Sequence, residues 1–173
     1  DCSDLACSKK RLDDTAARKA SGILFEQTFI RHWDTWADGR RNQLFVASFG
    51  ADGKLSGEPA KLTRGIDGDV PSKPFGDTDE FAWAPDGKSI VFNVRIAGRT
   101  EAWSTNFDLY RADVAGNSAP VNLTPDNKAW DAGPVFSADG KTLYYRAMKR
   151  PGFEADRFAL MAMDLASGKT REL

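Results

Sequence analysis

The sequence predicts an all-β fold, a partial β-propeller of about two to three four-stranded blades, with a short N-terminal helix. Three observations support this: strand-like runs dominate after residue 22, Asp-Gly pairs separate them, and a unit of about 50 residues recurs. The 173 residues are 41% hydrophobic, which is enough apolar content for a packed core. We therefore expect a folded β structure and no wholesale disorder.

Residues 4–20 favour a helix, because they are rich in Ala, Lys, Arg and Leu and contain neither Pro nor Gly. Leu5, Leu12 and Ala16 form one helical stripe, and the following Ser21-Gly22 is typical of a helix end. We therefore expect an N-terminal helical segment over residues 1–22 and a partial propeller over residues 23–173.

The only two cysteines, Cys2 and Cys7, lie at the start of the chain. A disulfide across this short gap is feasible, and it would indicate an oxidising compartment such as a periplasm. Two free thiols are an equal alternative, because spacing alone does not decide pairing. The chain begins with Asp1 and not Met, so we expect a piece of a longer gene product.

Strand-like runs flank three Asp-Gly pairs, at residues 52–53, 86–87 and 139–140. Such an arrangement indicates β-hairpins. Its physical basis is the positive φ that a tight turn requires, which Gly adopts freely and Asp tolerates.

Self-similarity extends beyond these hairpins. Residues 83–92 align without gaps on residues 136–145, and residues 108–113 parallel residues 159–164. A short strand after a Gly-bearing turn closes each unit. Four short strands per unit indicate propeller blades, which we place at about residues 23–63, 79–124 and 131–173.

Two to three blades do not close a propeller ring, which needs roughly four to eight. The missing blades must come from chain outside this sequence or from another molecule. We therefore expect exposed strand edges, with self-association or marginal stability as the consequence.

The repeated Asp-Gly-Lys element at 83–92 and 136–145 resembles the repeat of TolB-type propellers. The same repeat builds the propeller of prolyl-oligopeptidase-family serine peptidases. The segment Arg31-His32-Trp33-Asp34-Thr35-Trp36, followed by residues 40–45, is similar to the early propeller segment of bacterial dipeptidyl-peptidase and acylaminoacyl-peptidase-like members. The resemblance implies a periplasmic or secreted serine exopeptidase in which a propeller caps an α/β-hydrolase domain.

This resemblance implies that the catalytic Ser, Asp and His lie in the absent α/β-hydrolase domain. No G-x-S-x-G nucleophile elbow occurs here, so we expect no catalytic residue in this chain. The expected role is to gate or shape the access of a peptide substrate to that domain. The alternative is a TolB-like propeller that binds proteins as a scaffold and has no enzymatic activity.

Six residues are substrate-side candidates: Arg31, His32, Trp33, Asp34, Asp79 and Glu80. Some dipeptidyl peptidases of the family hold the substrate's amino group with propeller acids, but no motif assigns that role to the acids here. The structural alternative is that the Arg31–Asp34 segment fastens one blade, and that Asp79 and Glu80 form a solvated edge.

Charge and composition exclude several classes of partner. With 24 Lys and Arg against 25 Asp and Glu, the formal net charge is −1, so we expect no nucleic-acid or membrane partner. No motif has the spacing of a metal site, and no cofactor is implied. The long connections at residues 65–78 and 95–107 are where function is expected to lie.

Overall fold

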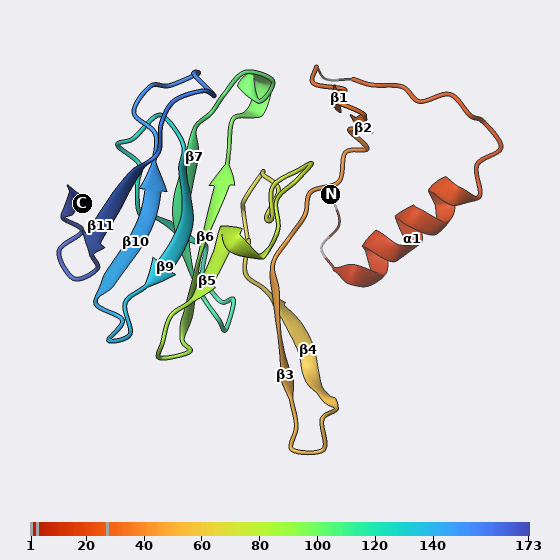
Figure 1. Cartoon of the computed structure of the whole chain (residues 1–173). Coiled ribbons are helices and arrows are strands. Elements are labelled where there is room, and N and C mark those ends of the chain that lie inside the picture. Colours follow the sequence, from red (N-terminus) through yellow and green to blue (C-terminus); the bar gives the residue numbers. More distant parts are fainter. Residues whose placement is uncertain (1, 3, 27) are drawn as a thin grey trace.

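The computed structural model describes residues 2, 4–26 and 28–173. Within these residues the chain consists mostly of strands, arranged in four antiparallel sheets, with one α-helix. Two of the sheets have four strands and lie side by side, as Figure 1 shows. The fold is therefore all-β and corresponds to part of a propeller, as the sequence predicts.

The second predicted unit forms a complete four-stranded sheet, here called the second blade. Its strands follow one another in chain order, each antiparallel to the next. They are β5 (Phe81–Trp83), β6 (Ser89–Arg95), β7 (Phe107–Asp113) and β8 (Val121–Asn122).

The third predicted unit repeats this arrangement and is here called the third blade. Its strands are β9 (Asp131–Phe136), β10 (Thr142–Ala147), β11 (Ala159–Asp164) and β12 (Thr170–Glu172). In both blades a short last strand pairs with the third strand, as the repeated closing motif predicts.

Only two strands precede these blades in a comparable position, β3 (Phe45–Phe49) and β4 (Leu55–Lys61), which pair into a hairpin. We call this pair the half-blade. The hydrogen bond from Leu62 N to Leu44 O (2.9 Å) has a counterpart from Leu123 N to Leu109 O (2.7 Å) in the second blade. The half-blade therefore corresponds to the third and fourth strands of a unit.

The N-terminal helix lies apart from the blades (Figure 1). Helix α1 (Leu5–Ala16) begins after Asp4, whose carboxylate accepts a hydrogen bond from Cys7 N (2.7 Å), as an N-cap does. The helix ends at Ala16, so the predicted end at Ser21-Gly22 was too late. None of its residues is buried, hence no packing against the blades supports a longer helix.

All three Asp-Gly hairpins are confirmed, and they share one set of hydrogen bonds. In the second blade Gly87 N donates to Ala84 O (2.9 Å) and Lys88 N donates to the Asp86 carboxylate (2.9 Å). The other two hairpins repeat both bonds. Each Gly has a positive φ, whereas the Asp before it does not. The Asp therefore acts through its carboxylate, and the Gly supplies the left-handed backbone.

Strand β6 lies in the middle of the core and is buried on both faces. Ile90, Phe92 and Val94 face the half-blade and pack with Leu62. Val91 faces the third blade and belongs to a second hydrophobic cluster. The remaining buried members of that cluster are Leu109, Leu143, Tyr145, Ala147 and Met163. Alternation along one strand thus joins three sheets.

One buried carboxylate accompanies the second cluster. Asp131, the first residue of β9, is almost completely inaccessible and accepts a hydrogen bond from Asn127 Nδ2 (2.9 Å). Burial raises the pKa of Asp131 to about 6, although hydrogen bonds from Asn127 and Thr124 oppose the shift. The contact between the second and third blades is therefore sensitive to the charge of this residue.

Candidate functional site

The long connections of the blades lie at one end of the molecule, opposite the Asp-Gly hairpins (Figure 1). We call it the loop end. It contains the loop between β6 and β7 and the loop between β10 and β11. Loops carried by rigid sheets are the usual location of binding residues, so this end is the candidate functional site.

The predicted Arg31–Asp34 segment forms a small hairpin made of β1 (Arg31–His32) and β2 (Thr35–Trp36). Trp33 lies in its turn with a positive φ of 53°, and Phe29 just before the hairpin has a φ of 66°. Such values are uncommon for aromatic residues and carry backbone strain. The Arg31 guanidinium lies over the Trp36 ring, 5.8 Å from its centroid.

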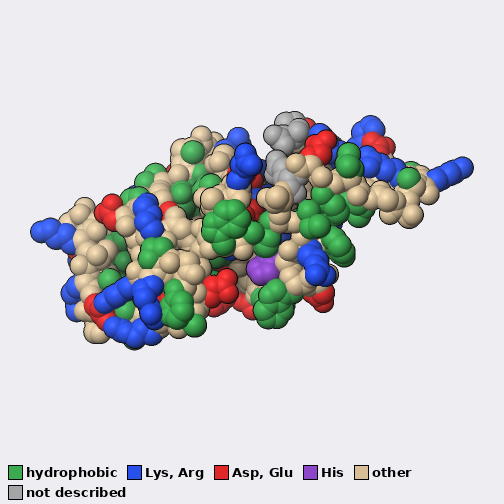
Figure 2. Space-filling model, turned by 90° about the horizontal axis from the view of Figure 1, so that it is seen from above, with side chains coloured by type: hydrophobic (Ala, Val, Ile, Leu, Met, Phe, Trp, Pro, Cys, Tyr) green, Lys and Arg blue, Asp and Glu red, His purple; other side chains and the backbone are tan. Residues whose placement is uncertain are grey.

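His32 is surrounded by aromatic rings. Its ring centroid lies 5.3 Å from that of Phe29 and 6.5 Å from that of Trp33. The ring centroids of Trp33 and Phe75 lie 5.2 Å apart. Within the described part of the chain, the buried Nδ1 of His32 has no hydrogen-bond partner. Trp33 and Phe75 are 72% and 69% exposed, and Figure 2 shows hydrophobic side chains beside the histidine at this end. We call Phe29, His32, Trp33 and Phe75 the aromatic patch.

A network of ion pairs centred on Arg41 holds the segments of this end together. Arg41, which precedes β3, donates to both carboxylate oxygens of Glu101 (2.8 and 2.7 Å) and to Asp69 (3.0 Å). A longer contact of 3.2 Å joins it to Asp67. The hydrogen bonds to Glu101, and then to Asp69, hold the pKa of Arg41 above its usual value. The network connects the half-blade, the loop after β4 and the β6–β7 loop.

Arg95 connects the same loop to the aromatic patch. Its guanidinium lies 5.2 Å from the Phe107 ring and 6.0 Å from the Phe29 ring, and it donates to Ser104 O (2.9 Å). Burial lowers the pKa of Arg95. Cation–π contacts of this kind stabilise a partly desolvated arginine, so Arg95 anchors the segment before β1 on the second blade.

Sequence reasoning missed this network, because its members are far apart in the chain and form no motif. The Asp67-Gly68-Asp69 stretch was the available signal. A Cβ built on Gly68 would lie 2.5 Å from Val94 Cγ2 and 2.6 Å from Arg95 O. Only Gly fits there, because the loop after β4 passes directly over β6.

The adjacent acids Asp79 and Glu80 lie in a short 3-10 turn, Thr78–Glu80, immediately before β5. Glu80 is buried and accepts hydrogen bonds from Ser72 N (2.6 Å) and Ser72 Oγ (2.7 Å). Asp79 is exposed and contacts Arg146 of the third blade at 3.4 Å. The two carboxylates therefore have separate partners, and neither lies in the aromatic patch.

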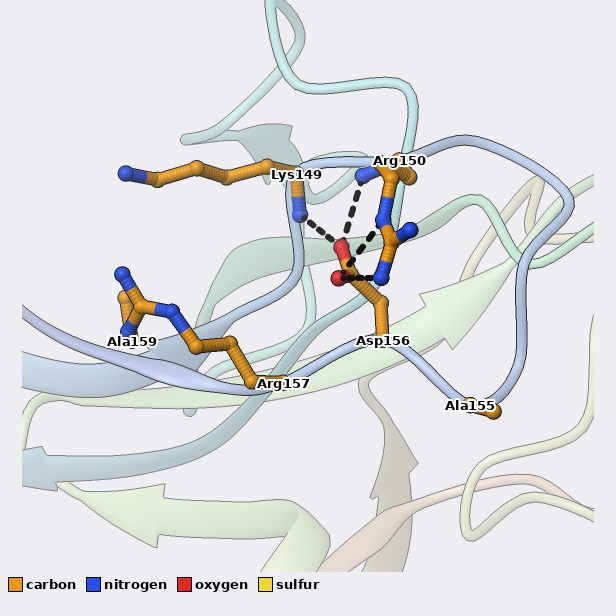
Figure 3. A pocket seen from close by; sticks show the side chains of 6 residues that line it. All are labelled: Lys149, Arg150, Ala155, Asp156, Arg157 and Ala159. Atoms are coloured by element: carbon orange, nitrogen blue, oxygen red, sulfur yellow. Dashed lines mark hydrogen bonds and ion pairs between the residues drawn. The ribbon is translucent and has the colours of Figure 1, made fainter.

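A pocket of 490 Å³ lies at the β10–β11 loop, and Figure 3 shows the residues that line it. Asp156 accepts hydrogen bonds there from the backbone N–H groups of Lys149 and Arg150 and from the Arg150 guanidinium, each at 2.9 Å. The side-chain hydrogen bond from Arg150 lowers the pKa of Asp156 most. These contacts fix the loop and leave the Asp156 carboxylate fully engaged.

The two cysteines are joined in the structure as a disulfide between Cys2 and Cys7. Among the described residues, no cluster of three or more His, Cys, Asp or Glu side chains has the arrangement of a metal site. The part of the chain that the structure describes also has no helix suited to crossing a bilayer. What the loop end presents chemically is exposed apolar side chains on strained backbone at Phe29 and Trp33.

These features define a class of protein, a partial β-propeller made of repeated four-stranded blades. No family model matches the chain. Among curated proteins it is similar to dipeptidyl-peptidase 5 of Porphyromonas gingivalis, with 31% identity over 87% of this chain and 22% of the relative. Dipeptidyl-peptidase 5 of Porphyromonas endodontalis is 33% identical over 84% of this chain and 20% of the relative.

A fungal relative, dipeptidyl-peptidase 5 of Aspergillus fumigatus, matches at 29% identity over 87% of this chain and 23% of its own length. The chain thus spans about a fifth of the length of these relatives. The predicted resemblance to a propeller segment of a dipeptidyl peptidase is confirmed. Among solved structures, TolB from Acinetobacter baumannii aligns with 76% of this chain and 32% of its own, at 22% identity and a TM-score of 0.44.

Proposed function

We propose that this chain is a non-catalytic propeller segment of a serine dipeptidyl peptidase, and that its loop end shapes the access of peptides to a separate catalytic domain. One observation carries the proposal: the similarity to dipeptidyl-peptidase 5 extends over 87% of this chain but only 22% of the relative. A segment of that extent leaves most of such an enzyme to other residues.

The chemistry of the chain supports a binding role. Propeller blades are rigid, and their loops can vary without disturbing the sheets. Within the described residues the loop end combines exposed Trp33 and Phe75 with strained backbone at Phe29 and Trp33. Strain of this kind persists where the surroundings fix it, often at ligand-binding positions.

The aromatic patch favours peptides with apolar side chains. Aromatic side chains bury a large area per residue and lose little conformational entropy on binding. The two least exposed acids of the ion-pair network, Asp69 and Glu101, are already engaged by Arg41, Lys73 and Arg95, so their charge is largely neutralised. We therefore assign apolar peptide contacts to Trp33 and Phe75, with Arg31, His32 and Asp34 shaping the hairpin that presents Trp33.

An extracytoplasmic location accompanies this proposal. The Cys2–Cys7 disulfide is the type of bond that persists in oxidising compartments and is rare in the cytosol. A periplasmic or secreted peptidase meets peptides in such a compartment. Thiol trapping of the protein directly from cells tests this point, and trapping of both cysteines as free thiols would contradict it.

The test of function uses the longer protein that contains this chain. We expect it to release dipeptides from chromogenic substrates, and we expect Trp33→Ala to raise KM for longer apolar peptides several-fold while kcat for short substrates is unchanged. Leu24→Ala is the matched control, because Leu24 is an exposed apolar residue outside the aromatic patch. A well-folded longer protein without hydrolysis would contradict the peptidase assignment and favour a protein-binding scaffold.

A further inference from the structure

The carboxylate of Asp131 is buried where the second and third blades meet, next to the loop end. Asp131 is 1% exposed, and it is paired in the β9–β10 register with Ala147, a member of the second hydrophobic cluster. Its Oδ1 accepts a hydrogen bond from Asn127 Nδ2 (2.9 Å), whereas its Oδ2 has no hydrogen-bond partner among the described residues. Such a carboxyl is better accommodated when it is neutral than when it is ionised.

The titratable neighbours of Asp131 do not neutralise its charge. Next to burial, the nearby carboxylate of Asp108 on β7 also raises the pKa of Asp131. On β10, burial raises the pKa of Tyr145 to about 12, so this phenol stays neutral. The other charged groups on the elements around β9 have partners elsewhere: Arg95 with Glu101, Lys128 with Pro125 O, Arg146 with Asp79, and Glu80 with Ser72. Ionisation of Asp131 therefore leaves a charge in the contact that no described cation pairs with.

The side chain of Asn127 connects Asp131 to the start of the β10–β11 loop. Its Nδ2 donates one hydrogen bond to Asp131 Oδ1 (2.9 Å) and another to Met148 O (3.0 Å), and its Oδ1 accepts from Ala129 N (3.1 Å). Met148 is the first residue after β10 and is buried. One amide group thus joins the buried carboxylate to the first backbone oxygen of the loop, so a displacement of either one affects the other.

The β10–β11 loop is closed by its own hydrogen bonds. Asp156 accepts from the backbone N–H groups of Lys149 and Arg150, each at 2.9 Å, which joins the two ends of the loop. Gly152 N donates to Thr105 Oγ1 (2.9 Å) and so connects the loop to the β6–β7 loop. A change at Asn127 therefore alters how the whole β10–β11 loop is attached to the second blade.

We propose that Asp131 is a pH-sensitive latch for the β10–β11 loop, which is held through Asn127 while the carboxyl is protonated and becomes mobile when the carboxyl ionises. Ionisation favours an opening of the contact that lets water reach the carboxylate, because hydration removes the penalty of a buried charge. The pKa of Asp131 is about 6 in the closed contact, so the closed form is favoured below this pH and is weakened above it. The latch does not depend on the peptidase assignment.

Hydrogen exchange of the longer protein that contains this chain measures the latch, with mass spectrometry of a peptide that covers residues 149–156. After correction for the intrinsic pH dependence of exchange, protection of these amides should fall about tenfold between pH 5 and pH 7.5. The reason is that opening lowers the pKa of the carboxyl from about 6 to about 4. Residues 137–142, which form the Asp-Gly hairpin at the other end of the same sheet, should change by less than about twofold.

Two variants separate the steps of the latch. Asp131→Asn cannot ionise, so its loop should stay protected at both pH values. Asn127→Ala keeps the carboxyl but lacks the bridge, so its loop should exchange alike at both pH values. Asp126→Asn, at an exposed position in the same segment, is the matched control and should behave like the wild type.

Loop protection in the wild type that does not change with pH would overturn the proposal. The wild-type response persisting in Asp131→Asn would also overturn it, because another group would then be the one that titrates. The same response in Asn127→Ala would contradict the bridge, since the charge would reach the loop by a different route.

Discussion

The second and third blades are built from the same repeat, yet equivalent positions have different environments. Leu109 on β7 is 0% exposed, whereas Leu160 on β11 is 61% exposed. Both leucines accept a hydrogen bond at their backbone oxygen from the closing strand of their own unit, at 2.7 and 2.9 Å. The pairing around these two leucines is therefore alike, although β9 and β10 carry a register shift between Tyr144 and Arg146 that β5 and β6 lack. What separates the two environments is the neighbouring sheet.

This comparison separates two levels of information in a repeat protein. The sequence of one unit determines its strands and their pairing, because turns and alternation act locally. The neighbouring unit determines which side of that sheet is buried. Stability in such a chain is a sum of unit and interface contributions, and the four predictions below divide along that line.

The largest effect is expected for the core leucine. Leu109→Ala should lower the free energy of unfolding by about 3 to 4 kcal/mol, because it leaves a cavity between two blades. Leu160→Ala should lower it by less than about 1 kcal/mol, since the side chain is already exposed. Urea denaturation of the monomeric chain measures both, and equal losses would remove the distinction between the two blades.

The buried carboxylate between these blades gives the second prediction. The pKa of Asp131 is about 6 in the folded state and about 4 when unfolded. Because folding raises the pKa of this carboxyl, its contribution to the free energy of unfolding is fully present below pH 4 and is lost as the pH rises through 6. Asp131→Asn keeps an oxygen that accepts the hydrogen bond from Asn127. Between pH 4 and pH 7.5 its free energy of unfolding should rise relative to that of the wild type by up to about 3 kcal/mol.

Thermal melts of both proteins at several pH values measure this difference. A gap between the two proteins that stays constant with pH would show that Asp131 does not carry the pH dependence.

The Asp-Gly hairpins should behave alike in both blades. Gly87 and Gly140 have φ values of 68° and 69°, and a Cβ on either meets no atom closer than ordinary contact. Replacing either glycine by Ala should lower the free energy of unfolding by about 1 to 2 kcal/mol, because a non-Gly residue is strained in the left-handed region. Denaturation of the two variants checks this, and clearly unequal losses would mean that the neighbouring unit also influences the turns.

The smallest effect is expected in α1, which contacts neither blade through a buried residue. Leu12→Ala should change the free energy of unfolding of the blades by less than about 0.5 kcal/mol, because surface substitutions away from packed features rarely do more. A calorimetric melt of the variant measures it. A loss of more than 1 kcal/mol would place α1 against the core.

The sequence was sufficient for the repeat, the hairpins and the short closing strands, because these depend on turn chemistry and on alternation over a few residues. The helix end was predicted too late because it was placed at the Ser21-Gly22 signal, whereas the helix ends at Ala16. Residues 23–25 and 28–30, which the prediction included in the first unit, are not in strands. No neighbouring strand among the described residues pairs with their backbone.

The candidate site was less accessible to sequence reasoning. The Arg31–Asp34 segment stood out by its composition, but its contact with Phe75 depends on a loop that returns after two further strands. Likewise, Arg41 and Glu101 lie 60 residues apart, and no spacing rule connects them. Long-range charge pairing follows from the path of the chain in space, which short motifs do not encode.

Native-state hydrogen exchange on the monomeric chain tests the central claim most directly, because β6 and β10 are both paired on two sides within their sheets. At low concentration we predict that the amides of Ile90 to Val94 exchange more slowly than those of Leu143 to Ala147, since sheets cover both faces of β6 but only one face of β10. Equal rates in the two strands at low concentration would contradict the account.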